Sequence, residues 1–191
     1  MQQHPRALMR LSHDEFARLV DQHQLRLHAY LAGLLGHTEQ AFDLVQETFY
    51  DAWRAAQDGT PPLISGAAET EVRRWLFRAG SNNALTLLRR RRLIRWESLE
   101  SLREPLLDGH DAFDEQLAEH DALQSALDTL SPQDVACLLL RVVHGFSAAE
   151  TGLILDTSAD NVNNRLARAK QRLRAAYSHH APHRREAHIP S

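Results

Sequence analysis

Long apolar runs, cysteine pairs and export signals are all missing from this sequence of 191 residues. No stretch approaches the roughly 20 apolar residues that a membrane-spanning helix requires, so we expect no membrane insertion. The first residues, MQQHPRALMRLSHDEF, contain no apolar segment of signal-peptide length, which predicts a cytoplasmic protein. The single Cys137 cannot form an internal disulfide, and its apolar neighbours predict a small buried side chain.

Motifs for catalysis and cofactor binding are also lacking. The 12 histidines are scattered, and we find no HExxH motif, no paired-cysteine motif and no glycine-rich loop that could hold a phosphate. Four histidines near the C-terminus lack a scaffold that would organise a metal site: His179, His180, His183 and His188. We therefore predict a protein that is not an enzyme and that binds no cofactor and no metal.

The charges that are present are distributed unevenly along the chain. The net charge of -3 averages over two basic clusters, one from Arg89 to Arg95 and one from Arg165 to Arg174. Between them, residues 97–121 hold nine acidic side chains and a single arginine. Basic surfaces of this kind bind polyanions, although each cluster, taken singly, could equally be a solvated helix face.

Signals for helices dominate the sequence. Ser12-His13-Asp14-Glu15 and Ser147-Ala148-Ala149-Glu150 are capping boxes, and Ser131-Pro132 combines an N-cap with a proline at the first helical position. Apolar residues recur at intervals of three and four residues, which predicts an all-α fold. The predicted helices cover about residues 12–36, 38–58 with Thr38 as N-cap, 69–93, 113–129, 132–144, 147–155 and 158–177.

An acidic segment without clear periodicity divides the predicted helices into two groups. It contains Pro105 and Gly109, which is typical of a linker. We therefore predict two small helical domains joined by an acidic linker, with a disordered tail at the end: residues 1–95, 96–112, 113–177 and 178–191. Within the first domain, two glycines and a proline pair predict a loop from about Gln57 to Ala68, and the weak helix formers from Gly80 to Asn83 leave open a break in the third helix.

The last two predicted helices have the spacing of a helix-turn-helix, because a short helix and a turn of about three residues precede a longer helix. A buried stripe of Val162, Leu166 and Ala169 leaves amides and arginines to face outward. Asparagine can bind adenine and arginine can bind guanine in the major groove, whereas the later cations suit phosphates. The groove-facing candidates are Asn161, Asn163, Asn164, Arg165 and Arg168, and the phosphate candidates are Lys170, Arg172 and Arg174. The alternative is a charged surface helix in an ordinary bundle.

The third predicted helix combines aromatic side chains, amides and cations. Trp75 and Phe77 precede Asn82 and Asn83, and a run of four arginines follows. Aromatic and cationic side chains together can stack unpaired bases and hold the backbone of a single strand. Trp75 could instead be an ordinary core residue, and this alternative stays open.

Three motifs resemble those of the extracytoplasmic-function (ECF) group of bacterial sigma factors, over about residues 16–95 and 117–177. They are DLVQETFYDAWR, WLFRAGSNNALTLLRRRR and HGFSAAETGLILDTSADNVNNRLARAKQRLR. The resemblance implies that the first motif binds core RNA polymerase, the second captures the melted minus-ten element and the third reads the minus-thirty-five element as duplex. It implies core RNA polymerase and promoter DNA, duplex and melted, as partners, and an anti-sigma factor as a further one.

The resemblance also assigns roles to particular residues. For core polymerase these are Asp43, Gln46, Glu47, Tyr50 and Arg54; for the downstream element they are Trp75, Arg78, Asn82, Asn83, Arg89, Arg90 and Arg91; for the upstream element they are Asn161, Asn163, Asn164, Arg165, Arg168, Lys170 and Arg172. Several positions depart from the family pattern, among them Phe42, Ser81, Thr86, Asp156 and Asn163. The loop before the second motif, which the family uses to hold a flipped base, departs as well.

Two other interpretations remain. A stand-alone helix-turn-helix regulator that binds duplex DNA explains the last helix, but it leaves DLVQETFYDAW and the arginine run without a role. A regulatory helical scaffold related to sigma factors could bind polymerase or another partner without initiating transcription.

Overall fold

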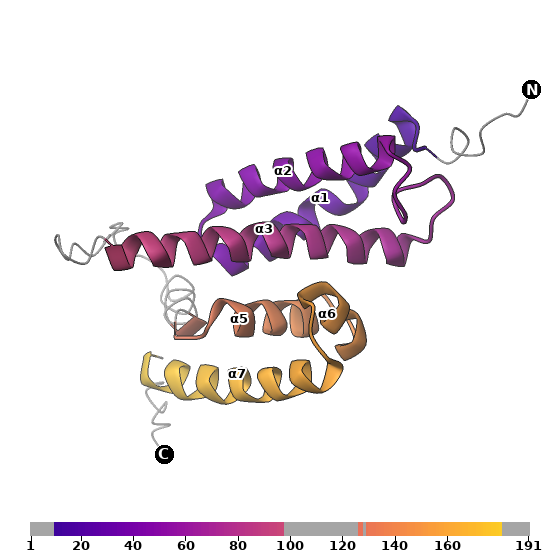
Figure 1. Ribbon diagram of the computed structural model, residues 1–191. Coiled ribbons are helices and arrows are strands. Elements are labelled where there is room, and N and C mark those ends of the chain that lie inside the picture. The colour runs from indigo at the N-terminus through magenta and orange to yellow at the C-terminus, as the bar shows by residue number, and fades with distance from the viewer. Residues whose placement is uncertain (1–9, 98–125, 128, 181–191) are drawn as a thin grey trace, which may run out of the picture.

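The computed structural model describes residues 10–97, 126–127 and 129–180, which are helical apart from turns, loops and one isolated β-bridge between Arg10 and Ile64. The prediction of an all-α fold is thereby confirmed. The elements are α1 (His13–Leu35), α2 (Thr38–Gln57), α3 (Glu69–Glu97), α5 (Pro132–Leu138), the π-helix η3 (Leu139–Val143), α6 (Ala148–Leu155) and α7 (Ala159–His180). In Figure 1, α1 to α3 form an N-terminal half that lies against a C-terminal half of α5, η3, α6 and α7.

The ends of α1 follow the sequence signals closely. Glu15 N donates to Ser12 Oγ at 3.3 Å, and Ser12 N donates to Glu15 Oε2 at 2.8 Å, which completes the predicted capping box. Gly36 adopts φ 70° and ends the helix in the left-handed conformation that glycine tolerates best. The N-cap of α2 was predicted one residue too late: it is His37, whose side chain makes no capping hydrogen bond, and Thr38 is already helical.

α3 continues without interruption through its weak helix formers, so the alternative of a break near Gly80 is wrong. Gly80 is buried, and a Cβ there would lie 3.2 Å from Leu27 Cδ1, so the small residue lets α1 and α3 approach closely. Ser81 Oγ donates to the Phe77 carbonyl at 2.6 Å and lies 2.7 Å from the Tyr30 hydroxyl, whose proton it accepts. The polar groups inside this packed interface are therefore satisfied, and packing outweighs helix propensity.

The loop between α2 and α3 has the predicted extent, and it is anchored at two points. The Leu63 side chain is fully buried in the core, and Ser65 Oγ donates to Glu15 Oε1 at 2.6 Å. Hydrogen bonds from Ser65 and then Ser12 lower the pKa of Glu15 to about 2, so this carboxylate is ionised at neutral pH.

The C-terminal half has the predicted helix caps, but the helix that begins at Pro132 changes from an α-helix to a π-helix. Asp134 N donates to Ser131 Oγ at 3.2 Å, and α5 begins at Pro132 as expected. The helix predicted to run to His144 becomes a π-helix after Leu138, and Gly145 then turns the chain with φ 70°. α6 begins at the second capping box, where Glu150 N donates to Ser147 Oγ at 3.1 Å.

Other predicted boundaries shift by a few residues. α3 ends at Glu97, two residues into the predicted linker, and α7 continues to His180, three residues into the predicted tail. The rest of that linker, the rest of that tail and most of the helix predicted over 113–129 lie outside the described residues.

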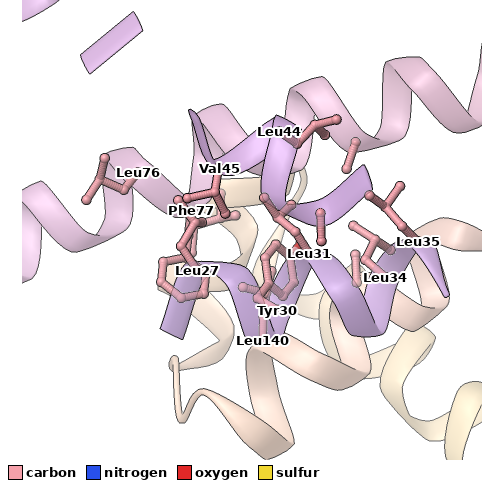
Figure 2. Close-up of a cluster of buried hydrophobic side chains, with 14 of the residues drawn as sticks. Leu27, Tyr30, Leu31, Leu34, Leu35, Leu44, Val45, Leu76, Phe77 and Leu140 are labelled. Carbon is pink, nitrogen blue, oxygen red and sulfur yellow. The ribbon is translucent and has the colours of Figure 1, made fainter. Parts of the chain in front are cut away.

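The two halves share one buried core rather than merely touching. Phe77 of α3 packs against Phe146 and His144 of the C-terminal half, with ring centroids 5.0 and 5.1 Å apart. Leu140 of η3 belongs to the same buried cluster as Tyr30 and Phe77 (Figure 2). Arg73 reaches across from α3, donates to the His144 carbonyl and places its guanidinium carbon 4.1 Å from the Phe146 ring centroid. We call this contact surface between the halves the seam.

The burial of His144 at the seam predicts that the free energy of unfolding depends on pH. Burial, with the nearby charges of Arg73 and Arg26, lowers the pKa of His144 to about 4. Between pH 6.5 and 4 the unfolded chain binds a proton that the folded chain excludes, so the free energy of unfolding falls as the pH falls. The free energy of unfolding should decrease between pH 7 and pH 4.5 in both proteins. We expect this decrease to be smaller by roughly 1–2 kcal/mol in His144→Gln than in the wild type.

Chemical denaturation at both pH values measures this difference. Substitution of the exposed His37 by Gln is the matched control and should leave the wild-type dependence in place. If His144→Gln shows the full wild-type loss of stability, the imidazole is not held neutral at the seam.

Candidate nucleic-acid interface

α6, a three-residue turn and α7 form the predicted helix-turn-helix. The turn is tight because Thr157 N donates to the Gly152 carbonyl and Asp156 adopts φ 53°. A Cβ on Gly152 would lie 2.6 Å from the Thr157 carbonyl oxygen, so glycine is required where the two helices meet. Val162 and Ala169 of α7 are fully buried and Leu166 between them is half-buried, so the stripe faces inward as predicted and the opposite side of α7 is its outer face.

The seven residues predicted for the upstream element divide into two groups on α7. Five are exposed: Asn163, Asn164, Arg168, Lys170 and Arg172, of which Arg172 also places its Nη1 3.9 Å from Asp134 Oδ2. Asn161 is half-buried, and its Nδ2 donates to Thr157 Oγ1 at 2.6 Å. Arg165 is also half-buried, and its Nη1 lies 3.2 Å from Oδ1 of Asp134 on α5. Asn161 and Arg165 therefore hold α7 in place within the C-terminal half.

The sequence-based predictions missed exposed residues on the outer face of α7 and also a residue that holds α7 in place. Asp160, Ala167 and Gln171 are exposed and spaced by three and four residues around Asn164, so they share its side of the helix. The helical spacing in the sequence is the signal that identifies them. Asp134 was missed as the partner of Arg165, and no local signal could have found it, because 31 residues separate the two.

On α3, four of the seven downstream candidates gather on one side. Trp75, Arg78, Asn82 and Arg89 are separated by three, four and seven residues, and the last three are exposed. Trp75 is half-buried and packs against the core cluster, so part of its side chain stays exposed.

The remaining downstream candidates do not join this group. Arg91 donates to Gln40 Oε1 on α2, and Arg90 is exposed on another side of α3. Asn83 is half-buried, and its Nδ2 is enclosed without a hydrogen-bond partner in the described part of the chain. The expectation that Phe77 belongs to a base-stacking surface is wrong, because this ring is fully buried at the seam.

The polymerase candidates on α2 are all exposed. Asp43, Glu47, Tyr50 and Arg54 are spaced by four, three and four residues and form a stripe opposite the buried face, and Gln46 lies beside them. The Arg54 guanidinium lies 5.9 Å from the Tyr50 ring centroid. Phe42 is 56% exposed at the start of this stripe and belongs to the same surface, although it was noted only as a departure from the family pattern.

Nothing in the described ranges suggests a metal or catalytic centre. No group of three or more His, Cys, Asp or Glu side chains there could hold a metal ion. Burial raises the pKa of the Cys137 thiol to about 11, which leaves little of the reactive thiolate at neutral pH. Of the helices in this part of the chain, none is long and apolar enough to cross a membrane.

Two family models match the chain in the order of its two halves. The model for sigma-70 region 2 matches residues 19–94, and the model for sigma-70 region 4 matches residues 120–173. The first match runs from Leu19 within α1 to Ile94 within α3, and the second covers α5, η3, α6 and α7 as far as Leu173. These matches define a sigma-70-type transcription factor.

Similar curated proteins narrow this class. SigE of Mycolicibacterium smegmatis, an ECF RNA polymerase sigma factor, is 33% identical over 168 residues, which are 85% of this chain and 62% of that protein. CnrH of Cupriavidus metallidurans, an RNA polymerase sigma factor, is 32% identical over 170 residues, covering 84% of this chain and 85% of CnrH. The chain thus spans less than two thirds of SigE, and 48% of the SigG proteins of Mycobacterium tuberculosis. It belongs to the ECF group of RNA polymerase sigma factors.

Solved structures share the fold. RpoE of Bartonella quintana, in complex with the anti-sigma factor NepR, superposes with a TM-score of 0.66 at 23% identity, covering 86% of this chain and 98% of RpoE. CnrH in complex with the cytosolic domain of CnrY gives a TM-score of 0.60 at 25% identity, covering 88% of this chain and 90% of CnrH.

The two groups of residues on α7 predict different mutational effects. Arg165→Ala leaves the buried Asp134 carboxylate without its nearest cation, so we expect the free energy of unfolding to fall by about 1–3 kcal/mol. Asn164→Ala changes an exposed side chain and should alter it by less than about 0.5 kcal/mol. Denaturant titration of the two variants measures both values.

A double variant checks the cause. In an Asp134→Asn background the cost of Arg165→Ala should shrink, because the buried charge is already gone. Equal costs in both backgrounds would show that Arg165 does not act through Asp134.

Proposed function

We propose that this chain binds core RNA polymerase and directs promoter recognition, DNA melting and transcription initiation as an ECF sigma factor. The observation that carries the proposal is the placement of three exposed surfaces on one chain in the order of the family. They are the acidic and polar stripe of α2, the aromatic and basic side of α3, and the amide and basic side of α7. We assign residues 1–95 to polymerase and the minus-ten element, and 113–177 to the minus-thirty-five element.

For the upstream element, we assign base recognition to the outer face of α7. Asn163 and Asn164 can pair with adenine and Arg168 with guanine, and each bidentate pair contributes roughly 1–3 kcal/mol of discrimination. Lys170 and Arg172 are exposed further along the helix and suit phosphates, which position the helix without specifying sequence.

For the downstream element, we assign the melted strand to the exposed side of α3. Arg78 and Arg89 can hold the backbone, Asn82 can hydrogen-bond a base edge, and Trp75 can stack a base with the part of its ring that lies outside the core. Stacking of one base on an aromatic ring is worth about 1–3 kcal/mol, so this contact would contribute to melting.

The proposal also concerns partners and location. The RpoE and CnrH neighbours were solved with the anti-sigma factor NepR and with the cytosolic domain of CnrY. By this likeness we propose that an anti-sigma factor also regulates this chain. Binding to polymerase places it in the cytoplasm.

The stripe on α2 provides the direct test. Reversing Asp43 and Glu47 to Arg changes two exposed charges at the proposed polymerase contact, so we expect affinity for purified core polymerase to fall at least tenfold. Fluorescence anisotropy of the labelled chain measures the affinity, and in vitro transcription from a genomic promoter library measures initiation. Asp21→Arg, an exposed reversal on α1, is the control that should bind normally.

Two results would contradict the proposal. Unchanged affinity of the double reversal would remove α2 from the polymerase interface. A chain that starts no transcripts with core polymerase, but binds duplex promoters alone as a dimer, would be a stand-alone regulator instead.

A further inference from the structure

A pocket lies at the end of the N-terminal half, where the loop before α3 meets the start of α1 (Figure 1). Its volume is about 240 Å³. α1, the loop and the first residues of α3 all contribute to its walls, with Leu19, Ile64 and Val72 as apolar members and Glu15, His23 and Glu69 as polar ones. Apolar walls with a few convergent polar groups are typical of a site for a small molecule.

His23 is enclosed at the wall of this pocket. Its side chain is only 2% exposed, and its Nδ1 has no hydrogen-bond partner among the residues that the structure describes. Burial lowers the pKa of His23, so the ring is neutral at neutral pH and one of its nitrogens is an acceptor. Because buried polar atoms in proteins are generally hydrogen-bonded, this wall suits a ligand that bonds an imidazole nitrogen.

Glu69 supplies a carboxylate near this ring. It is exposed at the start of α3 and forms no salt bridge within the described ranges. Of the charges that act on His23, that of Glu69 is the strongest, ahead of those of Arg73 and Arg26. The pocket therefore combines a neutral imidazole with a carboxylate that is available to a cation.

The other charged side chains at the pocket are already held by the chain. Glu15 Oε1 accepts a hydrogen bond from Ser65 Oγ at 2.6 Å, and Glu15 Oε2 accepts one from Ser12 N at 2.8 Å, which fixes this ionised carboxylate in place. Arg18, the one cation among the described lining residues, donates from Nε to the Asp14 carbonyl at 3.2 Å. Two carboxylates and one guanidinium leave the walls with a net negative charge.

These observations specify the class of ligand. We propose that this pocket binds a small primary amine with an apolar body, whose ammonium group lies between Glu69 and His23. The apolar body packs against Leu19, Ile64 and Val72. An ammonium group has three donors and no acceptor, so it can bond a carboxylate and a neutral imidazole at once. A cavity of about 150 Å³ is enough for benzene, so a pocket of about 240 Å³ has room for one ring with a short aminoalkyl chain.

Ligands of other classes fit these walls less well. A phosphate or a carboxylate would meet Glu15 and Glu69 at close range, and like charges repel. The pocket is also separate from the proposed DNA surface of α3. Glu69 and Arg78 are nine residues apart, which is two and a half helical turns, so they face opposite sides of the helix. The amine site therefore does not depend on the proposed function.

Nuclear magnetic resonance titration of the full-length chain tests the site with three probes that share one ring. Phenethylamine is cationic at neutral pH, 2-phenylethanol is a neutral counterpart and 3-phenylpropionate is anionic. We expect the amine to bind about tenfold more tightly than the alcohol, because a charge-assisted hydrogen bond replaces a neutral one, and the anion not to bind. The backbone amide signals that shift should include those of His23, Ala67 and Val72.

Removal of one charge tests the role of Glu69. Glu69→Gln should weaken phenethylamine binding about tenfold and leave 2-phenylethanol binding unchanged, because only the amine carries a charge. Glu71→Gln is the matched control and should bind the amine as the wild type does. Glu71 also lies in the first turn of α3, but it is not part of the pocket wall, and its Oε1 lies 3.9 Å from Arg74 Nη2.

A second variant tests the imidazole. His23→Phe keeps a ring of similar size and removes both nitrogens, so phenethylamine should bind about fivefold more weakly. Equal affinity of the wild type for the amine and the alcohol, unchanged amine affinity in Glu69→Gln, or signal shifts confined to residues outside the pocket would each overturn the site. A chain that binds the amine here but never initiates transcription with core polymerase would contradict the proposed function and leave this site standing.

Discussion

The packing of Phe77 is the contact on which the rest of the structure depends. Its ring is fully buried and lies against Tyr30 of α1 and against His144 and Phe146 of the C-terminal half. The Phe77 carbonyl accepts a hydrogen bond from the Ser81 hydroxyl, and the Ser81 hydroxyl accepts one from the Tyr30 hydroxyl. Because Phe77 fixes the rotation of α3 about its own axis, it also determines that Arg78, Asn82 and Arg89 face outward.

The seam combines aromatic packing with the burial of apolar side chains from both halves. It consists largely of aromatic packing, worth about 0.5–1.5 kcal/mol per ring pair beyond burial, and of Arg73 over Phe146, worth roughly 0.5–2 kcal/mol. α3 thus contributes Phe77 to the seam while Arg78, Asn82 and Arg89 on its opposite side stay exposed.

The helix-turn-helix shows how one row of polar residues divides between structure and recognition. Asn161 and Arg165 look equivalent to Asn164 and Arg168 in the sequence, but the first pair is held by Thr157 and Asp134 while the second pair is exposed. The exposed surface of α7 is thus narrower than its composition suggests, and it includes the uncharged Ala167. Under the proposed function, the Ala167 methyl group would suit a thymine methyl.

The sequence by itself determined most of the described helices, the caps at Ser12, Ser131 and Ser147, the loop before α3 and the order of the three motifs, because capping, glycine turns and apolar periodicity act over a few residues. It did not determine the N-cap of α2 or the π-helix after Leu138. It also placed the α2 stripe on one exposed side, since a single amphipathic helix defines its own buried face. Only the tertiary structure decided that Phe77 is core, that Arg165 pairs with Asp134 and that the halves share a seam. These facts depend on contacts between residues 31 to 71 positions apart, and no local pattern encodes such distances.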